Sequence, residues 1–191
     1  CYPGNLKNFI NITKEYIKKY NPKVTIIHST VAPGTTKKIG DNVVHSPCHG
    51  KHPNLAQGIK IFVKYVGGDN VFAVFIADKF LRQAGIKTHL VANSKTSELS
   101  KIYCTSYYGW NLVFMKTLAE ICKEEEVSFY EVYTLWNKFY NEGYDELGND
   151  KFTRPVLDPI AGKLGGHCVV NNCDLHDSLI TKTIKEQNEK Y

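Results

Sequence analysis

The sequence lacks several features that would place it in a common class of protein. No apolar run approaches the roughly 20 residues that a membrane span requires, and the first residues carry no signal-peptide pattern. Although the net charge is +5, the basic residues form no long block, so nucleic acid is not an expected partner. Internal repeats and low-complexity segments are also absent. We therefore expect a cytoplasmic globular protein with no membrane or nucleic-acid partner.

The sequence also has neither the small size that calls for stabilising disulfides nor the cysteine spacing of a zinc ribbon. The chain is too long and too aliphatic to need disulfides, so its six cysteines are expected as reduced thiols. Soft ligands do recur at short spacing, and a metal site is an alternative that the spacing does not favour. These ligands are Cys48, His49, His52, His167, Cys168, Cys173 and His176.

The first half of the chain alternates between strand and helix patterns. Apolar residues at helical spacing predict helices over 5–20 and 69–83, the second capped by Asp69. Short β-branched or apolar runs predict strands over 23–29, 42–45, 59–66 and 86–91. Such alternation is typical of an α/β domain with a parallel or mixed sheet.

The pattern changes after Ala92, where strand signals stop. One long helical period runs from Ser94 to Glu126, and a capping box of Ser128 and Glu131 predicts the start of the next helix. Residues 143–163 have no period and are expected as loop, and a last helix is expected over 174–190. We therefore divide the chain into an α/β part, 1–93, and a helical part, 94–191.

The segment Gly165-Gly166-His167-Cys168 is the sharpest chemical feature. Adjacent glycines let the backbone approach a ligand closely, and a thiol just beyond them is placed as a nucleophile. The alternative is a loop cysteine with no chemical task, since most free cysteines only pack.

Two further segments could bind an anion. Lys101 follows Glu98 by three residues and precedes Thr105 by four, so the three share a helix face on which the lysine could steady an oxyanion. A plain surface pair of Glu98 and Lys101 is the alternative. The loop Ser29–Thr36 follows a strand, where α/β sheets bind ligands; its hydroxyls and amides suit a phosphate or ribose, or else simply form a Pro-Gly turn.

Taken together, the order and spacing of these segments resemble the UDP-glucose/GDP-mannose dehydrogenase family across essentially the whole chain. The matching motifs are Cys1-Tyr2-Pro3, Ser29–Thr36, Ser46-Pro47, Glu98–Lys101 and Gly165–Cys168. The resemblance implies the second half of a Rossmann-like NAD-binding domain followed by an all-helical central dimerisation domain. It also implies a homodimer paired through the long helix.

The activity that the resemblance implies is a two-step oxidation of a nucleotide sugar, from primary alcohol through aldehyde to carboxylate, with NAD as cofactor. Cys168 would form a thiohemiacetal and then a thioester, and Lys101 would stabilise the oxyanion. The same resemblance places Thr30, Ser29 and Pro3 at the cofactor. It places Gly165, Gly166, His167 and Thr105 at the substrate.

Several positions depart from the family pattern. Cys48 and His52 stand where the family has acids, Thr105 stands for an asparagine, and Asn172 stands for a catalytic aspartate. His52 could act as a base in place of a carboxylate, because imidazole titrates near neutral pH.

The dinucleotide Gly-x-Gly-x-x-Gly motif is missing from the sequence, and the family has it upstream of the Cys-x-Pro turn. We therefore expect the chain to be a fragment or a truncated member that binds NAD weakly by itself. A non-catalytic dimerisation or ligand-binding module that retains the fold is the alternative function.

Overall fold

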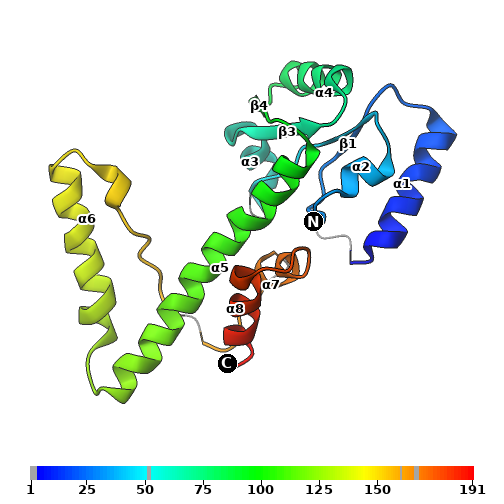
Figure 1. Ribbon diagram of the computed structural model, residues 1–191. Helices are drawn as coiled ribbons and strands as arrows, with labels where there is room; N and C mark the ends of the chain where they lie inside the picture. Colours follow the sequence, from blue (N-terminus) through cyan, green and yellow to red (C-terminus); the bar gives the residue numbers. More distant parts are fainter. Residues whose placement is uncertain (1–3, 51–52, 160, 166–167) are drawn as a thin grey trace.

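The computed structural model describes residues 4–50, 53–159, 161–165 and 168–191. A small sheet with its covering helices lies at one end, and the long helix α5 (Ser94–Glu124) runs from it to the opposite end of the molecule (Figure 1). The remaining helices flank α5. The fold class expected from the sequence, an α/β part followed by a helical part, is therefore confirmed.

Four short strands form the sheet in the order β1, β2, β3, β4. β1 (Thr25–Ile27) pairs in parallel with β2 (Val43–His45), which pairs antiparallel with β3 (Lys64–Gly68). β3 pairs in parallel with β4 (Thr88–Leu90). The sheet is therefore mixed, with one antiparallel pair between two parallel ones.

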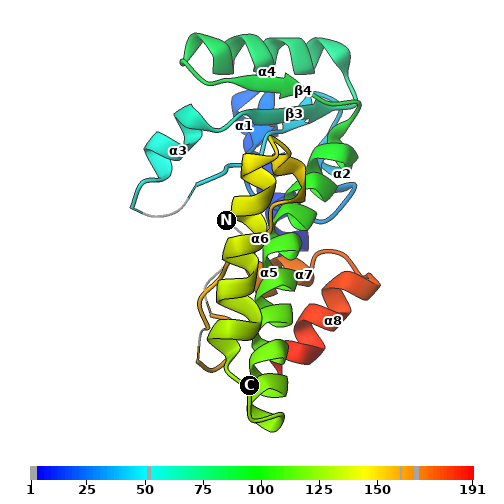
Figure 2. The same ribbon diagram turned by 90° about the vertical axis from the view of Figure 1, so that its left-hand side faces the viewer.

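Helices cover the sheet because their apolar sides meet its buried valines. α4 (Val71–Gln83) packs Val74 and Ala77 against Val44 and Val66. α1 (Leu6–Tyr20) and α2 (Thr35–Ile39) enclose a second cluster with β1 and β2. In Figure 2, α4 spans one face of the sheet and α3 (Leu55–Ile61) projects to the side.

The predicted strand over 59–66 is wrong in its first half. Residues 55–61 form α3, and β3 starts only at Lys64. The run Ile59–Val66 is mostly apolar and contains Lys60 and Lys64, a short pattern that a strand and a helix end can share, so periodicity could not separate the two. The cap of α4 is Asn70 rather than Asp69, because the Asn70 side chain accepts from the amide of Phe72 at 2.9 Å.

The helical part forms its own core around α5. Leu112, Met115 and Ile184 are buried together with Tyr133 and Leu164. After α5 the chain turns into a π-helical segment, Tyr130–Leu135, and then α6 (Trp136–Glu146), which folds back toward the sheet end. A short 3-10 helix follows over Asp150–Phe152. No helix in the described ranges is long and apolar enough to cross a membrane.

The last helix predicted over 174–190 is present, but it begins later than predicted, and a short helix before it was not predicted. The structure has α7 (Val169–Cys173) and, after a corner, α8 (Leu179–Asn188). α8 starts with a capping box in which the Ser178 hydroxyl accepts from the Thr181 amide and Thr181 reciprocates. This box satisfies the free amides at the start of α8, which explains why the helix begins at Leu179 and not at Asp174.

Candidate functional site

Glu98 ties the long helix to the predicted ligand loop. Its side chain is fully buried, and its carboxylate accepts hydrogen bonds from the Thr36 amide at 2.8 Å, the Thr36 hydroxyl at 2.7 Å and the Gly34 amide. Burial raises the pKa of the Glu98 carboxyl above its ordinary value, although these hydrogen bonds oppose the shift. The surface pairing of Glu98 with Lys101 is therefore wrong: the glutamate is a buried anchor.

This anchor changes what the loop Ser29–Thr36 can bind. The amides of Gly34 and Thr36 already donate to Glu98, and the Thr35 hydroxyl donates to the Ala32 carbonyl at 2.6 Å. The Gly34 and Thr36 amides are thus not free to bind a phosphate, and for the rest of the loop ligand binding stays a prediction. Ser29 is half-buried and Thr30 is 2% exposed at the end of β1.

His45, at the end of β2, also connects the loop Ser29–Thr36 to α5. One of its ring nitrogens, Nε2, lies 3.1 Å from the Ser29 carbonyl, and Nδ1 lies 2.8 Å from the Ser97 hydroxyl. A carbonyl only accepts, so Nε2–H donates to Ser29. Burial lowers the pKa of His45 to about 4, with nearby Lys64 adding to the effect, so the ring is neutral at neutral pH.

Lys101 lines an open pocket of about 620 Å³ at the start of α5. Phe62, Val63 and Tyr65 form its apolar wall, while His49 and Cys104 lie on its polar side. A volume of this size, largely apolar with a few polar groups, is ordinary for a small-molecule site of about 300–1,000 Å³.

His49 is a pocket residue that we did not predict as catalytic. Its Nδ1 is buried with no hydrogen-bond partner in the described part of the chain, and its ring lies 6.0 Å from that of Phe62. Burial, then the positive charges of Lys101 and Lys64, lower the pKa of His49, which keeps it neutral. In the sequence, only its position next to Cys48, the residue that directly follows the Ser-Pro turn, could have indicated His49. The predicted base His52 lies outside the described residues.

Two positions that depart from the family pattern meet each other. The Asn172 amide donates to the Thr105 hydroxyl at 3.0 Å, joining α7 to α5. Asn172 is 2% exposed, so the pair is a buried contact. The threonine hydroxyl and the neutral amide therefore complement each other as acceptor and donor. Asn172 acts here as a partner of Thr105.

The direction of α7 sets the place of Cys168. Val169 packs on Gly109, where an added Cβ would lie 2.4 Å from its Cγ1, while Asn172 meets Thr105. α7 therefore runs antiparallel to α5, and Cys168 precedes Val169 at its exposed start. Lys101 and Gly109 are about 12 Å apart along α5, since each residue rises 1.5 Å.

Among the described residues, the structure links the helix of Lys101 to α7 through Thr105 and Asn172 but does not place Cys168 at Lys101. Cys168 is not among the described residues that line the Lys101 pocket. Gly165 is exposed with open space around its Cα, and Gly166, His167 and Pro3 lie outside the described residues. No group of three or more metal-ligand side chains occurs within the described segments.

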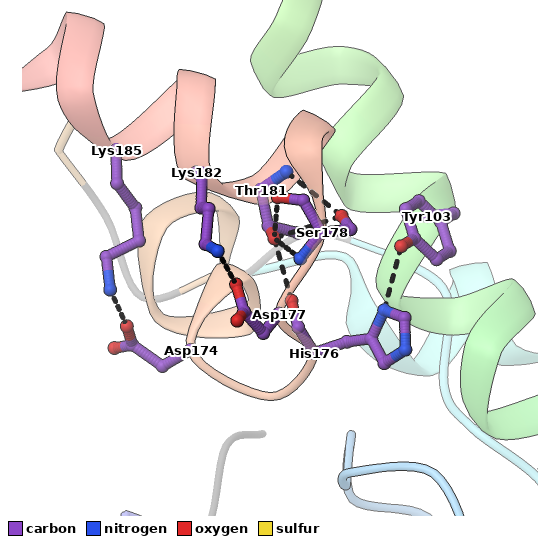
Figure 3. A network of polar contacts seen from close by, with 8 residues as sticks. All are labelled: Tyr103, Asp174, His176, Asp177, Ser178, Thr181, Lys182 and Lys185. Carbon is purple, nitrogen blue, oxygen red and sulfur yellow. Dashed lines mark hydrogen bonds and ion pairs between the residues drawn. The ribbon is translucent and has the colours of Figure 1, made fainter.

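The corner between α7 and α8 is fixed to α5 by a polar network (Figure 3). The Tyr103 hydroxyl lies 2.8 Å from Nδ1 of His176, and the Thr181 hydroxyl donates to the His176 carbonyl at 2.7 Å. Exposed ion pairs join Lys182 to Asp177 and Lys185 to Asp174. The helix that carries Cys168 is therefore held at both ends.

Comparison with known proteins supports the family resemblance. No protein-family model matches the chain. UDP-N-acetyl-D-mannosamine dehydrogenase from Methanococcus vannielii is 24% identical over 175 residues, which is 88% of this chain and 38% of that protein.

Solved structures share the fold. UDP-D-ManNAc dehydrogenase from Pyrococcus horikoshii matches with a TM-score of 0.78 and 20% identity, covering 97% of this chain and 46% of that one. NDP-N-acetyl-D-galactosaminuronic acid dehydrogenase from Methanosarcina mazei matches with a TM-score of 0.73 and 18% identity, over 97% and 44%. The chain spans less than half the length of these relatives. Its predicted resemblance to nucleotide-sugar dehydrogenases is confirmed.

Proposed function

We propose that this chain is part of an NAD-dependent nucleotide-sugar dehydrogenase, which oxidises the primary alcohol of the sugar to a carboxylate. The observation that carries the proposal is the α5–α7 contact, in which the helix of Lys101 meets the helix of Cys168 through Thr105 and Asn172. UDP-N-acetylmannosamine is the first substrate to test, because the similar proteins from Methanococcus vannielii and Pyrococcus horikoshii carry its name.

In this proposal Cys168 is the nucleophile of the second oxidation. Its Sγ bonds to the aldehyde carbon and its proton passes to the aldehyde oxygen, giving a thiohemiacetal. Loss of a hydride from carbon and of the proton from the hydroxyl leaves a thioester, and water then cleaves the S–C bond to release the carboxylate, a proton and the thiol. Lys101 stabilises the negative oxygen that develops at each stage.

NAD would supply the hydride acceptor for both oxidations. Ser29 and Thr30 fit one edge of such a cofactor, because they follow the carboxyl end of β1, where α/β sheets bind ligands. The amides of Gly34 and Thr36 do not fit its phosphates, because Glu98 already accepts from them. The residues present here therefore provide only part of a cofactor site.

His49 is a second candidate for the base. It lies in the pocket with Lys101 and its lowered pKa keeps the imidazole neutral, so a nitrogen is free to accept a proton from water or an alcohol. His52 remains a prediction from the aligned position.

A cytoplasmic homodimer completes the proposal. Its support is the set of exposed aromatic side chains on α5 and α6, which a soluble monomer would leave in water. They are Tyr107, Tyr108, Trp110, Phe114, Trp136 and Phe139. The same surface would suit the alternative function, a non-catalytic dimerisation module. The absence of Cys168 from the described lining of the Lys101 pocket favours that alternative.

Thiol alkylation distinguishes the two functions. Cys104 is the matched control, since it is exposed like Cys168, whereas Cys173 is buried and burial raises the pKa of its thiol. A dehydrogenase predicts that Cys168 reacts faster than Cys104 and that UDP-N-acetylmannosamine with NAD slows its reaction. Equal rates with no protection would favour the non-catalytic module.

A further inference from the structure

Lys64 is a buried cation that the proposed reaction does not use. It starts β3 and is 1% exposed. Its Nζ donates to the carbonyls of Ser46 at 2.8 Å and Pro47 at 3.0 Å, and the Sγ of Cys48 lies 3.5 Å away. The buried Lys64 amine and the Cys48 thiol therefore lie side by side next to the Ser46-Pro47 turn.

Each partner has the property that a reaction between them needs. Burial lowers the pKa of Lys64, although nearby Cys48 opposes the shift, so more of the amine is neutral and carries a free electron pair than at an exposed lysine. Cys48 is half-buried, so a small oxidant can reach its sulfur while Nζ approaches from the protein side. Cysteine oxidation follows exposure in this way.

We propose that Cys48 and Lys64 form a peroxide-responsive modification site, in which oxidation joins Sγ to Nζ as a sulfenamide. Hydrogen peroxide first converts the Cys48 thiol to a sulfenic acid and is itself reduced to water. The Nζ electron pair then attacks Sγ, the S–O bond breaks, and the leaving hydroxyl takes one amine proton as a second water. Sulfenic acids condense with a backbone nitrogen to give sulfenamides, and in this proposal the Lys64 amine takes the place of that nitrogen.

The cross-link would act on the pocket beside it. Pro47 and His49, the two neighbours of Cys48, both line the pocket that contains Lys101. Joining Cys48 to β3 would fix this segment against the sheet and would protect the sulfur from further oxidation. A thiol reductant such as dithiothreitol would reverse it, because thiols cleave S–N bonds of this kind as they cleave disulfides.

The test is peptide mass mapping of the full chain after treatment with hydrogen peroxide. The expected product is a linked pair of peptides, one with Cys48 and one with Lys64, whose mass is the sum of the two less two hydrogens. The link should form when the folded protein is treated and should not form when the protein is treated in urea, because unfolding separates Sγ of Cys48 from Nζ of Lys64.

Two variants isolate the amine. Lys64→Arg keeps the charge but replaces the amine with a guanidinium that stays protonated, so the linked peptide should disappear and Cys48 should proceed to the sulfinic acid. Lys60→Arg, at an exposed position on α3, should retain the linked peptide. Circular dichroism checks that both variants fold.

Three outcomes would overturn the proposal. They are sulfinic acid at Cys48 of the folded wild-type protein with no linked peptide, a Cys48–Cys104 disulfide as the main product, or a link that forms equally in urea. The comparison of folded with urea-treated wild type decides the matter even if Lys64→Arg does not fold.

Discussion

Glu98 shows how one buried side chain connects two motifs that are far apart in the sequence. Its carboxylate accepts from Gly34, which precedes α2, and from Thr36 on α2, while its backbone belongs to α5. Because a buried carboxylate is costly unless its oxygens are bonded, these contacts fix the loop to the helix. Sequence spacing predicted that Lys101 faces a ligand, but it could not predict this partner, which is 62 residues away.

Replacing Glu98 with Gln should destabilise the protein by about 1–3 kcal/mol. One of the two carboxylate oxygens becomes an NH2 group, which cannot accept a hydrogen bond, so a buried donor of Gly34 or Thr36 loses its acceptor. Urea denaturation at pH 7 measures the change.

The pH dependence of stability gives a second check on Glu98. A raised folded pKa means that folding takes up a proton, so the free energy of unfolding decreases as pH rises from 4.5 through the folded pKa. Glu98→Gln should lack this decrease; an unchanged slope would contradict the role.

His45 should give the opposite pH dependence. Its pKa falls from 6.5 to about 4 on folding, so the unfolded chain binds more protons between these values. Stability should therefore be fully present above pH 6.5 and should be lost as pH falls toward 4, by up to about 3 kcal/mol at 1.36 kcal/mol per unit. Urea denaturation of wild type and His45→Gln across this range isolates the histidine. Parallel curves for the two proteins would show that His45 is not responsible.

At the scale of elements, the sequence predicted helices better than their ends. The apolar period of α1, α4 and α5 gave their extent to within a few residues, because each presents one side to a core. The period missed the short helix α7 and did not show that α8 begins only at Leu179, since the capping box at Ser178 depends on a threonine where glutamate or glutamine is usual. Nor did it mark Gly109 as a contact, because a glycine inside a helix looks only unfavourable.

Gly109 is required for the close approach of α7. In Gly109→Ala the new Cβ would lie 2.4 Å from Cγ1 of Val169, so α7 must shift. We expect a loss of about 1–3 kcal/mol of stability and slower alkylation of Cys168 relative to Cys104. Urea denaturation and the alkylation rates measure the two effects.

Two controls accompany this prediction. Val169→Ala in the same chain should restore most of the lost stability, because it removes the methyl group that the alanine meets. Gly143→Ala, on α6 with open space around it, should instead stabilise by about 0.5–1 kcal/mol. If Gly109→Ala behaved like Gly143→Ala, the packing of α7 on α5 would be incorrectly described.

For the whole molecule, the exposed aromatic surface of α5 and α6 predicts self-association. Phe114 is 57% exposed and Phe139 is 61% exposed. Phe114→Asp should weaken a dimer by about 2 kcal/mol, or roughly 30-fold in Kd, because it places a charge in an apolar contact. Light scattering over a concentration series measures this. Phe75→Asp, at an exposed position on α4, is the matched control and should leave the dimer unchanged; a monomeric wild type would refute the interface.

The central claim is that Cys168 carries the second of two oxidations. The most direct measurement is the number of NADH molecules formed per molecule of UDP-N-acetylmannosamine consumed, in the longest natural polypeptide that contains this chain. We predict two for the wild type, and at most one for Cys168→Ser, which cannot form the thioester and stops at the aldehyde. Two NADH per sugar from Cys168→Ser, or none from the wild type with any nucleotide sugar, would contradict the account.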